Sequence, residues 1–162
     1  MTENSQDVWK NEYPYLSSVK DFDKKSPKFK WQKKFTNKEL KNLFPKIGGI
    51  KNIEILNITN TGRVKNVRLD GAYGSDQMSG VDLRKRLGLN SNFVRFKFIG
   101  EETNNKFPMK KDLIVFGQGS GHGVGMSQWG AKYMASKGQK AEIILKHYYR
   151  GIQIKPFRKD FL

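Results

Sequence analysis

The chain has 162 residues, with 31 Lys plus Arg against 15 Asp plus Glu and a mean hydropathy of −0.71. This length suits a single domain, 1–162, and eleven Phe, six Tyr and three Trp supply enough apolar surface to exclude general disorder. The absence of cysteine excludes a disulfide scaffold, a zinc ribbon, an iron–sulfur site and a thiol nucleophile. The net charge of +16 favours an anionic partner such as nucleic acid, an acidic membrane surface or a cell-wall polymer. An ordinary Lys-rich surface without such a partner is the competing interpretation.

Residues 1–35 are polar, with scattered aromatic side chains, and we expect them to wrap a surface without regular structure. The first seven residues lack the basic start and apolar run of a signal peptide, and no stretch approaches the 18 apolar residues of a membrane span. Thr36-Asn37-Lys38-Glu39 is a capping box and predicts a helix that ends at Pro45. Alternating apolar residues predict a hairpin over residues 50–70 that turns at Asn60-Thr61-Gly62.

Residues 71–75 are expected to form a loop, and Ser79-Gly80-Val81-Asp82 predicts a second capping box before a short helix that stops at Gly88. Residues 93–99 and 113–116 are predicted strands. Two helices follow, over residues 126–137 and 140–149.

Ile152 and Ile154 suggest one last strand. This order of elements predicts an α+β fold with a mostly antiparallel sheet, short helices, and a Gly-rich strand that leads into a C-terminal helical pair.

One segment has a pronounced chemical character, and we call residues 117–125 the glycine ladder. Glycine occupies every second position of it, at Gly117, Gly119, Gly121, Gly123 and Gly125. In an extended chain this spacing leaves one face without side chains, which permits close approach of a ligand and also allows positive φ. A helix is predicted to begin near Met126, and its free N–H groups favour an acceptor or an anion beside the ladder.

The side chains around the ladder leave several interpretations open. His122 is either a general base or a structural residue that fixes the loop, whereas Ser127 is more plausibly a helix N-cap than a nucleophile. Only one other histidine, His147, is present, so we expect no metal site. No register gives G-x-G-x-x-G, and G-x-x-x-x-G-K-[ST] does not occur, so we expect no nucleotide and no other cofactor.

The run from Gly119 to Ala131, Gly-x-Gly-His-Gly-Val-Gly-Met-Ser-Gln-x-Gly-Ala, strongly resembles the stage II sporulation protein D (SpoIID) family, also called the amidase enhancer (LytB) family. Tyr13-Pro14-Tyr15-Leu16 and the closing residues 147–151 agree with it in order. The resemblance covers essentially the whole chain and corresponds to the C-terminal part of the family's domain.

The resemblance implies cleavage of peptidoglycan by a lytic transglycosylase during engulfment of the forespore. Such an enzyme uses one carboxylic acid to protonate the glycosidic oxygen, and the C6 hydroxyl of the muramic sugar then attacks C1 to give a 1,6-anhydro ring. The family's acid is a Glu in a Glu-Met-Pro-like motif upstream of the matched region. Glu12 stands in the only Glu-x-Pro here but follows no apolar helix. We therefore expect no catalytic residue in this chain.

The resemblance also implies the partners and the location of the protein. It points to peptidoglycan glycan strands and to other engulfment or wall-hydrolase proteins as partners, to no nucleic acid, and to the cell envelope outside the cytoplasmic membrane. A membrane anchor is expected only upstream of this segment.

Three functions remain as hypotheses: a lytic-transglycosylase module, a non-catalytic glycan-binding or amidase-stimulating module, and a basic nucleic-acid binder. The predicted substrate-binding residues are Gly121, His122, Gly123, Ser127 and Gln128, with Tyr73 and Ser75 as a facing wall.

Overall fold

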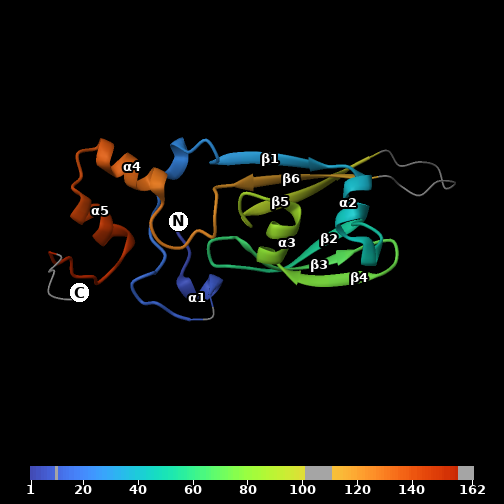
Figure 1. Cartoon of the computed structure of the whole chain (residues 1–162), viewed down its shortest axis with the longest axis horizontal. Helices are drawn as coiled ribbons and strands as arrows, with labels where there is room; N and C mark the ends of the chain where they lie inside the picture. Colours follow the sequence, from blue (N-terminus) through green and yellow to red (C-terminus); the bar gives the residue numbers. More distant parts are fainter. Residues whose placement is uncertain (10, 101–110, 157–162) are drawn as a thin grey trace. The chain divides into compact units, whose positions relative to one another are not determined.

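The computed structural model describes residues 1–9, 11–100 and 111–156. These residues fall into two compact units, which are described separately below (Figure 1). Unit 1 comprises Met1–Lys25 and Gly123–Leu162, and unit 2 comprises Ser26–His122. The expected organisation as one domain, equivalent to part of a larger family domain, stays a prediction.

The described residues of unit 2 form two antiparallel sheets of three strands each. The first sheet has the order β1-β6-β5, and the second has the order β2-β3-β4. The strands are β1 (Lys30–Phe35), β2 (Asn52–Ile58), β3 (Val64–Asp70), β4 (Ser75–Ser79), β5 (Val94–Ile99) and β6 (Asp112–Gln118). With five short α-helices in the described residues, this arrangement confirms the predicted α+β class.

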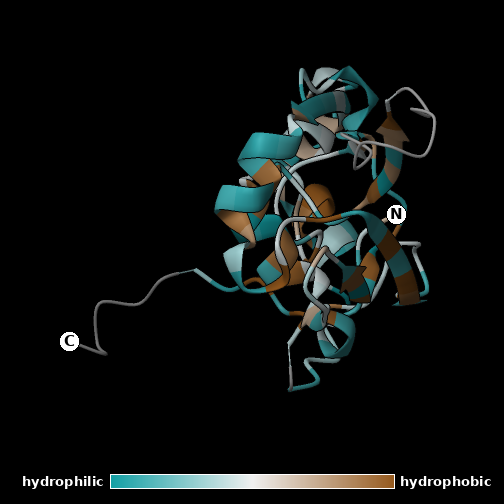
Figure 2. Ribbon diagram, turned by 90° about the vertical axis from the view of Figure 1, so that its right-hand side faces the viewer, coloured by the Kyte–Doolittle hydropathy of each residue, from teal (hydrophilic) through white to brown (hydrophobic). Residues whose placement is uncertain are grey.

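One hydrophobic core holds unit 2 together. Alternate side chains of the central strands point into it, and Val67, Leu113 and Val115 are completely buried. The helices α2 (Asn37–Leu43) and α3 (Gly80–Leu87) contribute apolar side chains from one face each. Figure 2 shows the same pattern, with brown apolar residues on the strands and helices that carry both brown and teal residues.

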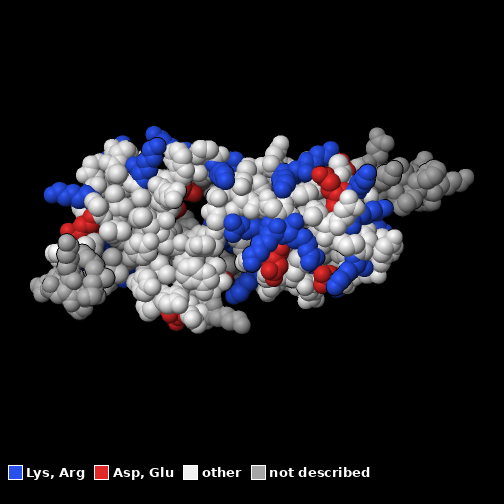
Figure 3. Space-filling model, in the orientation of Figure 1, with Lys and Arg blue, Asp and Glu red and all other residues white. Residues whose placement is uncertain are grey.

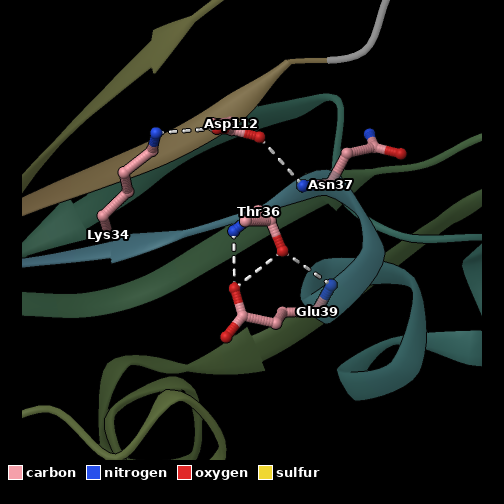
Figure 4. Close-up of polar contacts among 5 residues, drawn as sticks. All are labelled: Lys34, Thr36, Asn37, Glu39 and Asp112. Atoms are coloured by element: carbon pink, nitrogen blue, oxygen red, sulfur yellow. Dashed lines mark hydrogen bonds and ion pairs between the residues drawn. The ribbon is translucent and has the colours of Figure 1, made fainter.

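The predicted capping box at the start of α2 is present and lies beside Asp112, the first residue of β6 (Figure 4). The Glu39 carboxylate accepts a hydrogen bond from the Thr36 N–H at 2.7 Å, and the Thr36 hydroxyl oxygen accepts one from the Glu39 N–H at 3.3 Å. Asp112, in β6, accepts from Lys34 at 2.9 Å and from the Asn37 N–H at 3.1 Å. These hydrogen bonds favour the charged forms and lower the pKa of Glu39 and of Asp112. They therefore join β1, α2 and β6 at one corner.

The start of α3 differs in detail from the prediction. The Ser79 side chain accepts from the Asp82 N–H at 3.0 Å, as a cap should, but the Asp82 carboxylate accepts from the Ser79 hydroxyl at 2.7 Å. The predicted second capping box is therefore only half formed, because aspartate is one methylene shorter than the glutamate of α2. At the other end of α3, the Lys33 ammonium donates to the carbonyl oxygen of Leu87 at 2.9 Å, where a cation is stabilising.

Unit 1 joins the two ends of the described chain. It contains α1 (Ser5–Val8), the 3₁₀ turn η1 (Asp23–Lys25), α4 (Gln128–Ser136) and α5 (Ala141–Tyr148). Its smaller core consists of Val19, Met134, Ile144 and Tyr148. The Tyr148 hydroxyl donates to Asp21 at 2.8 Å, and burial, followed by the Asp21 carboxylate, strongly raises the pKa of Tyr148.

Three expectations for individual elements are wrong. Residues 1–35 are not irregular throughout, because they contain the helix α1 and the strand β1. Ser75 begins strand β4 rather than ending a loop. Ile152 and Ile154 do not lie in a strand. Strands β1 and β4 have mostly polar, exposed side chains. Pairing with their partner strands, rather than local hydrophobic alternation, defines these two strands.

The pairing of β1 with β6 fixes the point at which the glycine ladder begins. Trp31 lies directly opposite Gly117, and a Cβ atom on Gly117 would overlap the indole ring. The indole N–H donates to the Gly119 carbonyl oxygen at 2.8 Å. The first glycine of the ladder therefore makes room for a tryptophan of the neighbouring strand.

We expect Gly117→Ala to destabilise the protein by about 1–3 kcal/mol, because the added methyl group must displace the Trp31 ring and its hydrogen bond. Urea denaturation of the variant and the wild type measures this loss. In a Trp31→Ala background the same substitution should cost much less, because the ring that it displaces is gone. An equal loss in both backgrounds would contradict the proposed packing role.

Candidate functional site

The glycine ladder is extended only at its beginning. Gly117 lies in β6, whereas the four following ladder glycines have φ of 71°, 82°, 85° and 76°. The expectation of positive φ is confirmed, but the expected extended strand with one bare face is wrong beyond Gln118. Left-handed residues at every second position turn the chain repeatedly, and glycine is the residue that adopts them without strain.

Internal hydrogen bonds hold the unit 2 part of the ladder in place. The Gly119 N–H donates to the Phe29 carbonyl oxygen at 3.2 Å, and the Gly121 N–H donates to that of Asn90 at 2.9 Å. The buried Ser91 hydroxyl donates to the Gln118 carbonyl oxygen at 2.7 Å. Several backbone groups that the sequence offered to a ligand are thus bonded within the chain. These hydrogen bonds therefore fix the conformation of this part of the ladder.

Gly121 has open space at its α-carbon. A Cβ atom built there meets nothing within 4 Å, although φ is 82°. The neighbouring His122 side chain reaches solvent. A side chain of this protein therefore does not block the approach to the α-carbon of Gly121.

Two arginines act on His122 electrostatically. Partial burial, followed by the positive charges of Arg84 and Arg63, lowers the pKa of His122 below its ordinary value of 6.5. The effect is moderated by solvent, because the ring is exposed. The lowered pKa favours the uncharged imidazole, which has one ring nitrogen that can donate a hydrogen bond and one that can accept one.

The arginines of this site belong to the second sheet and its helix. Arg63 precedes β3 and is 92% buried, with its guanidinium carbon 5.8 Å from the centre of the Phe93 ring. Arg84 lies on α3, half-buried, and its Nε donates to the Leu89 carbonyl oxygen at 3.3 Å. Sequence reasoning missed both residues, because single arginines do not stand out in so basic a chain.

The residues after the ladder have mainly structural roles. The Ser127 side chain accepts from the Gly130 N–H at 3.1 Å and caps α4, which confirms the N-cap interpretation. A Cβ atom on Gly130 would overlap the Tyr148 hydroxyl and the Asp21 carboxylate, so this glycine is required for close packing. Gln128, the first residue of α4, is exposed and remains available to a ligand.

The structure separates the other predicted site residues. The Gly123 carbonyl oxygen accepts from the Glu3 N–H at 2.9 Å within unit 1. Tyr73, 81% exposed, lies in the turn between β3 and β4, and Ser75 is the first residue of β4 after that turn. This turn follows the last residue of β3, whereas Arg63 precedes the first, so about 20 Å of strand separates the turn from the His122 environment. Figure 1 shows the turn between β3 and β4 at the opposite end of unit 2 from the end of β6 that leads into the ladder.

Within residues 1–9, 11–100 and 111–156, no three His, Asp or Glu side chains gather in a way that could hold a metal ion. In that same part of the chain, no helix has the length and apolar character that crossing a membrane requires.

We expect the stability of the wild type to fall more steeply than that of His122→Gln as the pH drops below about 6.5. The folded protein resists protonation of His122, so the unfolded chain binds more protons in the interval between the lowered pKa and 6.5. Above about pH 7 both states are neutral at this position, and the difference between the two proteins should be constant. Urea denaturation between about pH 5 and about pH 8 tests this.

Arg84→Gln serves as the control for the electrostatic cause. Removing this charge should raise the pKa of His122 and bring it closer to its ordinary value of 6.5. NMR titration of the assigned imidazole measures this change. A His122 that titrates identically with and without Arg84 would show that the guanidinium has no influence on it.

Comparison with known families and proteins shows what this chain is similar to. A family model described as "Domain of unknown function (DUF8618)" matches residues 15–125, from the segment that precedes η1 to the end of the ladder. Four curated proteins also match over more than nine tenths of the chain.

The chain is 38% identical over 156 residues to "Stage II sporulation protein D" of Bacillus subtilis (strain 168), which covers 94% of this chain and 41% of that protein. The Bacillus amyloliquefaciens protein of the same name is 35% identical over the same shares. The "Amidase enhancer" of Bacillus subtilis (strain 168) is 28% identical over 195 residues, 93% of this chain and 27% of that protein.

These matches confirm the resemblance that the ladder motif indicated, and the chain spans about two fifths of the length of its stage II sporulation protein D relatives. Because the family model covers more than half of the chain, the chain belongs to the family described as "Domain of unknown function (DUF8618)".

Proposed function

We propose that this chain acts on the cell wall during sporulation and binds the glycan strands of peptidoglycan at Gly121 and His122. The similarity to stage II sporulation protein D along 94% of the chain supports the sporulation context, and the similarity to an amidase enhancer supports a role beside wall hydrolases outside the cytoplasmic membrane. The observation that carries the site is the open space at the α-carbon of Gly121, next to the exposed side chain of His122.

The chemistry of these residues suits a peptidoglycan strand. Its sugars offer hydroxyl and acetamido groups, which a neutral imidazole can both donate to and accept from. The peptides attached to the muramic sugar carry carboxylates, for which the guanidinium of Arg84 is a geometrically matched partner. Gly121 allows the sugar to approach the backbone without meeting a side chain.

We further propose that the reaction served by this binding is lytic transglycosylation, which leaves 1,6-anhydromuramic ends. The chain would hold the glycan strand. It would not supply the proton for the glycosidic oxygen, because none of its carboxylates matches the acid of the family. Glu12 is exposed and precedes Tyr13-Pro14 at the surface of unit 1. Gly123, Ser127 and Gln128 in unit 1, and Tyr73 and Ser75 in unit 2, are proposed as further contacts along the strand.

The binding prediction uses two glycines with nearly the same φ angle. Gly121 and Gly138 have φ of 82° and 80°, and an added Cβ meets nothing within 4 Å at either position. Gly121→Ala and Gly138→Ala should therefore lose similar stability, about 1–2 kcal/mol. Only Gly121→Ala should weaken binding to peptidoglycan oligomers, by up to about tenfold, because only its methyl group enters the proposed site. Isothermal titration measures the affinities.

Salt dependence separates glycan binding from the nucleic-acid alternative. Binding of nucleic acid would weaken steeply with salt, with a log–log slope of about −0.9 per phosphate contact, whereas binding through hydroxyl groups should change little. Equal affinity of the two glycine variants for the oligomers, or tight salt-sensitive binding of DNA in place of them, would contradict the proposal.

The chain by itself should release no 1,6-anhydromuropeptides from purified peptidoglycan, because it contains no residue at the acid position of the family. Mass spectrometry of the soluble products provides the measurement. Glu12→Gln is the informative control: if the wild type releases anhydro products and this variant does not, Glu12 is the acid and our assignment is wrong.

A further inference from the structure

Three aromatic side chains form an exposed cluster in unit 1, which we call the aromatic cluster: Trp9, Tyr13 and Tyr15. Their exposed fractions are 39%, 37% and 42%. The Trp9 and Tyr13 ring centres are 6.2 Å apart at an interplanar angle of 80°, and those of Tyr13 and Tyr15 are 5.9 Å apart at 54°. The rings thus contact one another through edges and faces, and each still presents surface to solvent.

The backbone beneath the aromatic cluster is held firmly. The buried Ser5 hydroxyl accepts from the Tyr13 N–H at 2.8 Å and donates to the Tyr13 carbonyl oxygen at 3.3 Å. The Trp9 N–H donates to the Ser5 carbonyl oxygen at 2.7 Å, and the Arg150 N–H donates to that of Tyr15 at 3.1 Å. The aromatic rings are therefore displayed on a fixed segment, so that a ligand does not have to order it.

Exposed clustered aromatic rings of this kind indicate a binding surface, because large apolar side chains are otherwise mostly buried. We propose that the aromatic cluster is a second contact surface for glycan, on which the C–H face of a sugar ring stacks. This inference rests on the proposed function, and it adds a surface in unit 1 to the site at Gly121 and His122 in unit 2. The tyrosine hydroxyls can bond to sugar hydroxyl groups at the edge of the stack.

The charges nearby favour an uncharged sugar face over other partners that bind aromatic rings. The acidic residues Asp7 and Glu12 share this segment with one basic residue, Lys10, and Glu12 is exposed. Their carboxylates would repel the phosphates of nucleic acid and of an anionic lipid surface, but they accept hydrogen bonds from sugar hydroxyls. The rings are also less than half exposed, whereas an interfacial membrane anchor inserts its apolar face into the bilayer.

The test compares aromatic variants that share the same exposure. Trp9→Ala and Tyr15→Ala should each weaken binding of uncharged N-acetylglucosamine oligomers about three- to tenfold, as measured by isothermal titration. Trp9→Phe and Tyr15→Phe keep a ring and should retain most of the affinity. Phe116→Ala, which removes a 42% exposed ring from β6 of unit 2, is the matched control and should bind as the wild type does. Circular dichroism checks the fold of every variant.

The outcomes separate this inference from the proposed function. If Gly121→Ala weakens binding while both alanine variants of the aromatic cluster bind normally, the glycan site stands and the second surface is refuted. If the wild type binds no oligomer, the proposed function fails and the inference fails with it. Flotation with phosphatidylglycerol vesicles is the remaining arm, and vesicle binding that Trp9→Ala abolishes would overturn the inference in favour of a membrane surface.

Discussion

The steric constraint at Gly117 determines where the candidate site of unit 2 lies. Gly117 is in the middle strand of a sheet, where its missing side chain leaves space for the Trp31 ring. The same indole binds the Gly119 carbonyl oxygen, so one residue of β1 both packs on the end of β6 and restrains the first turn of the ladder. Gly121 and His122 follow within three residues. Their position relative to α3 is therefore a consequence of strand packing rather than of a separate loop structure.

Positive charge and histidine chemistry are linked in unit 2. This unit contains 19 of the 31 Lys and Arg residues but 8 of the 15 acidic ones, and Figure 3 shows blue side chains gathered over the region of α3. The arginines that would attract a carboxylate also lower the pKa of His122. The same field thus favours an anionic group of a ligand and keeps the imidazole able to accept a hydrogen bond. Unit 1 offers different chemistry, with exposed aromatic rings beside carboxylates.

The elements that the sequence predicted well are those with local causes. The cap of α2 depends on Thr36 and Glu39, three residues apart, and the cap of α4 on Ser127 and Gly130. Strand β1 depends instead on β6, and Trp31 and Gly119 are 88 positions apart, so its polar sequence carried no local signal. At the site, the alternate glycines predicted positive φ but not the path of the chain, because extended and left-handed conformations share that spacing. Tertiary hydrogen bonds decide between them.

The discontinuity of unit 1 has a consequence for the order of folding during synthesis. Glu3 pairs with Val124 in a parallel bridge, so the first residues of the chain bond to residues that the ribosome adds much later. At about 5–20 residues per second, the partner segment follows after roughly 6–24 s. Unit 2, continuous in sequence, has its whole core available before then. Its compaction brings Phe29 and Gly119 together, because the Gly119 N–H donates to the Phe29 carbonyl oxygen, and this shortens the loop that the two ends must close. Folding of unit 2 thus prepares the two segments of unit 1 for their assembly.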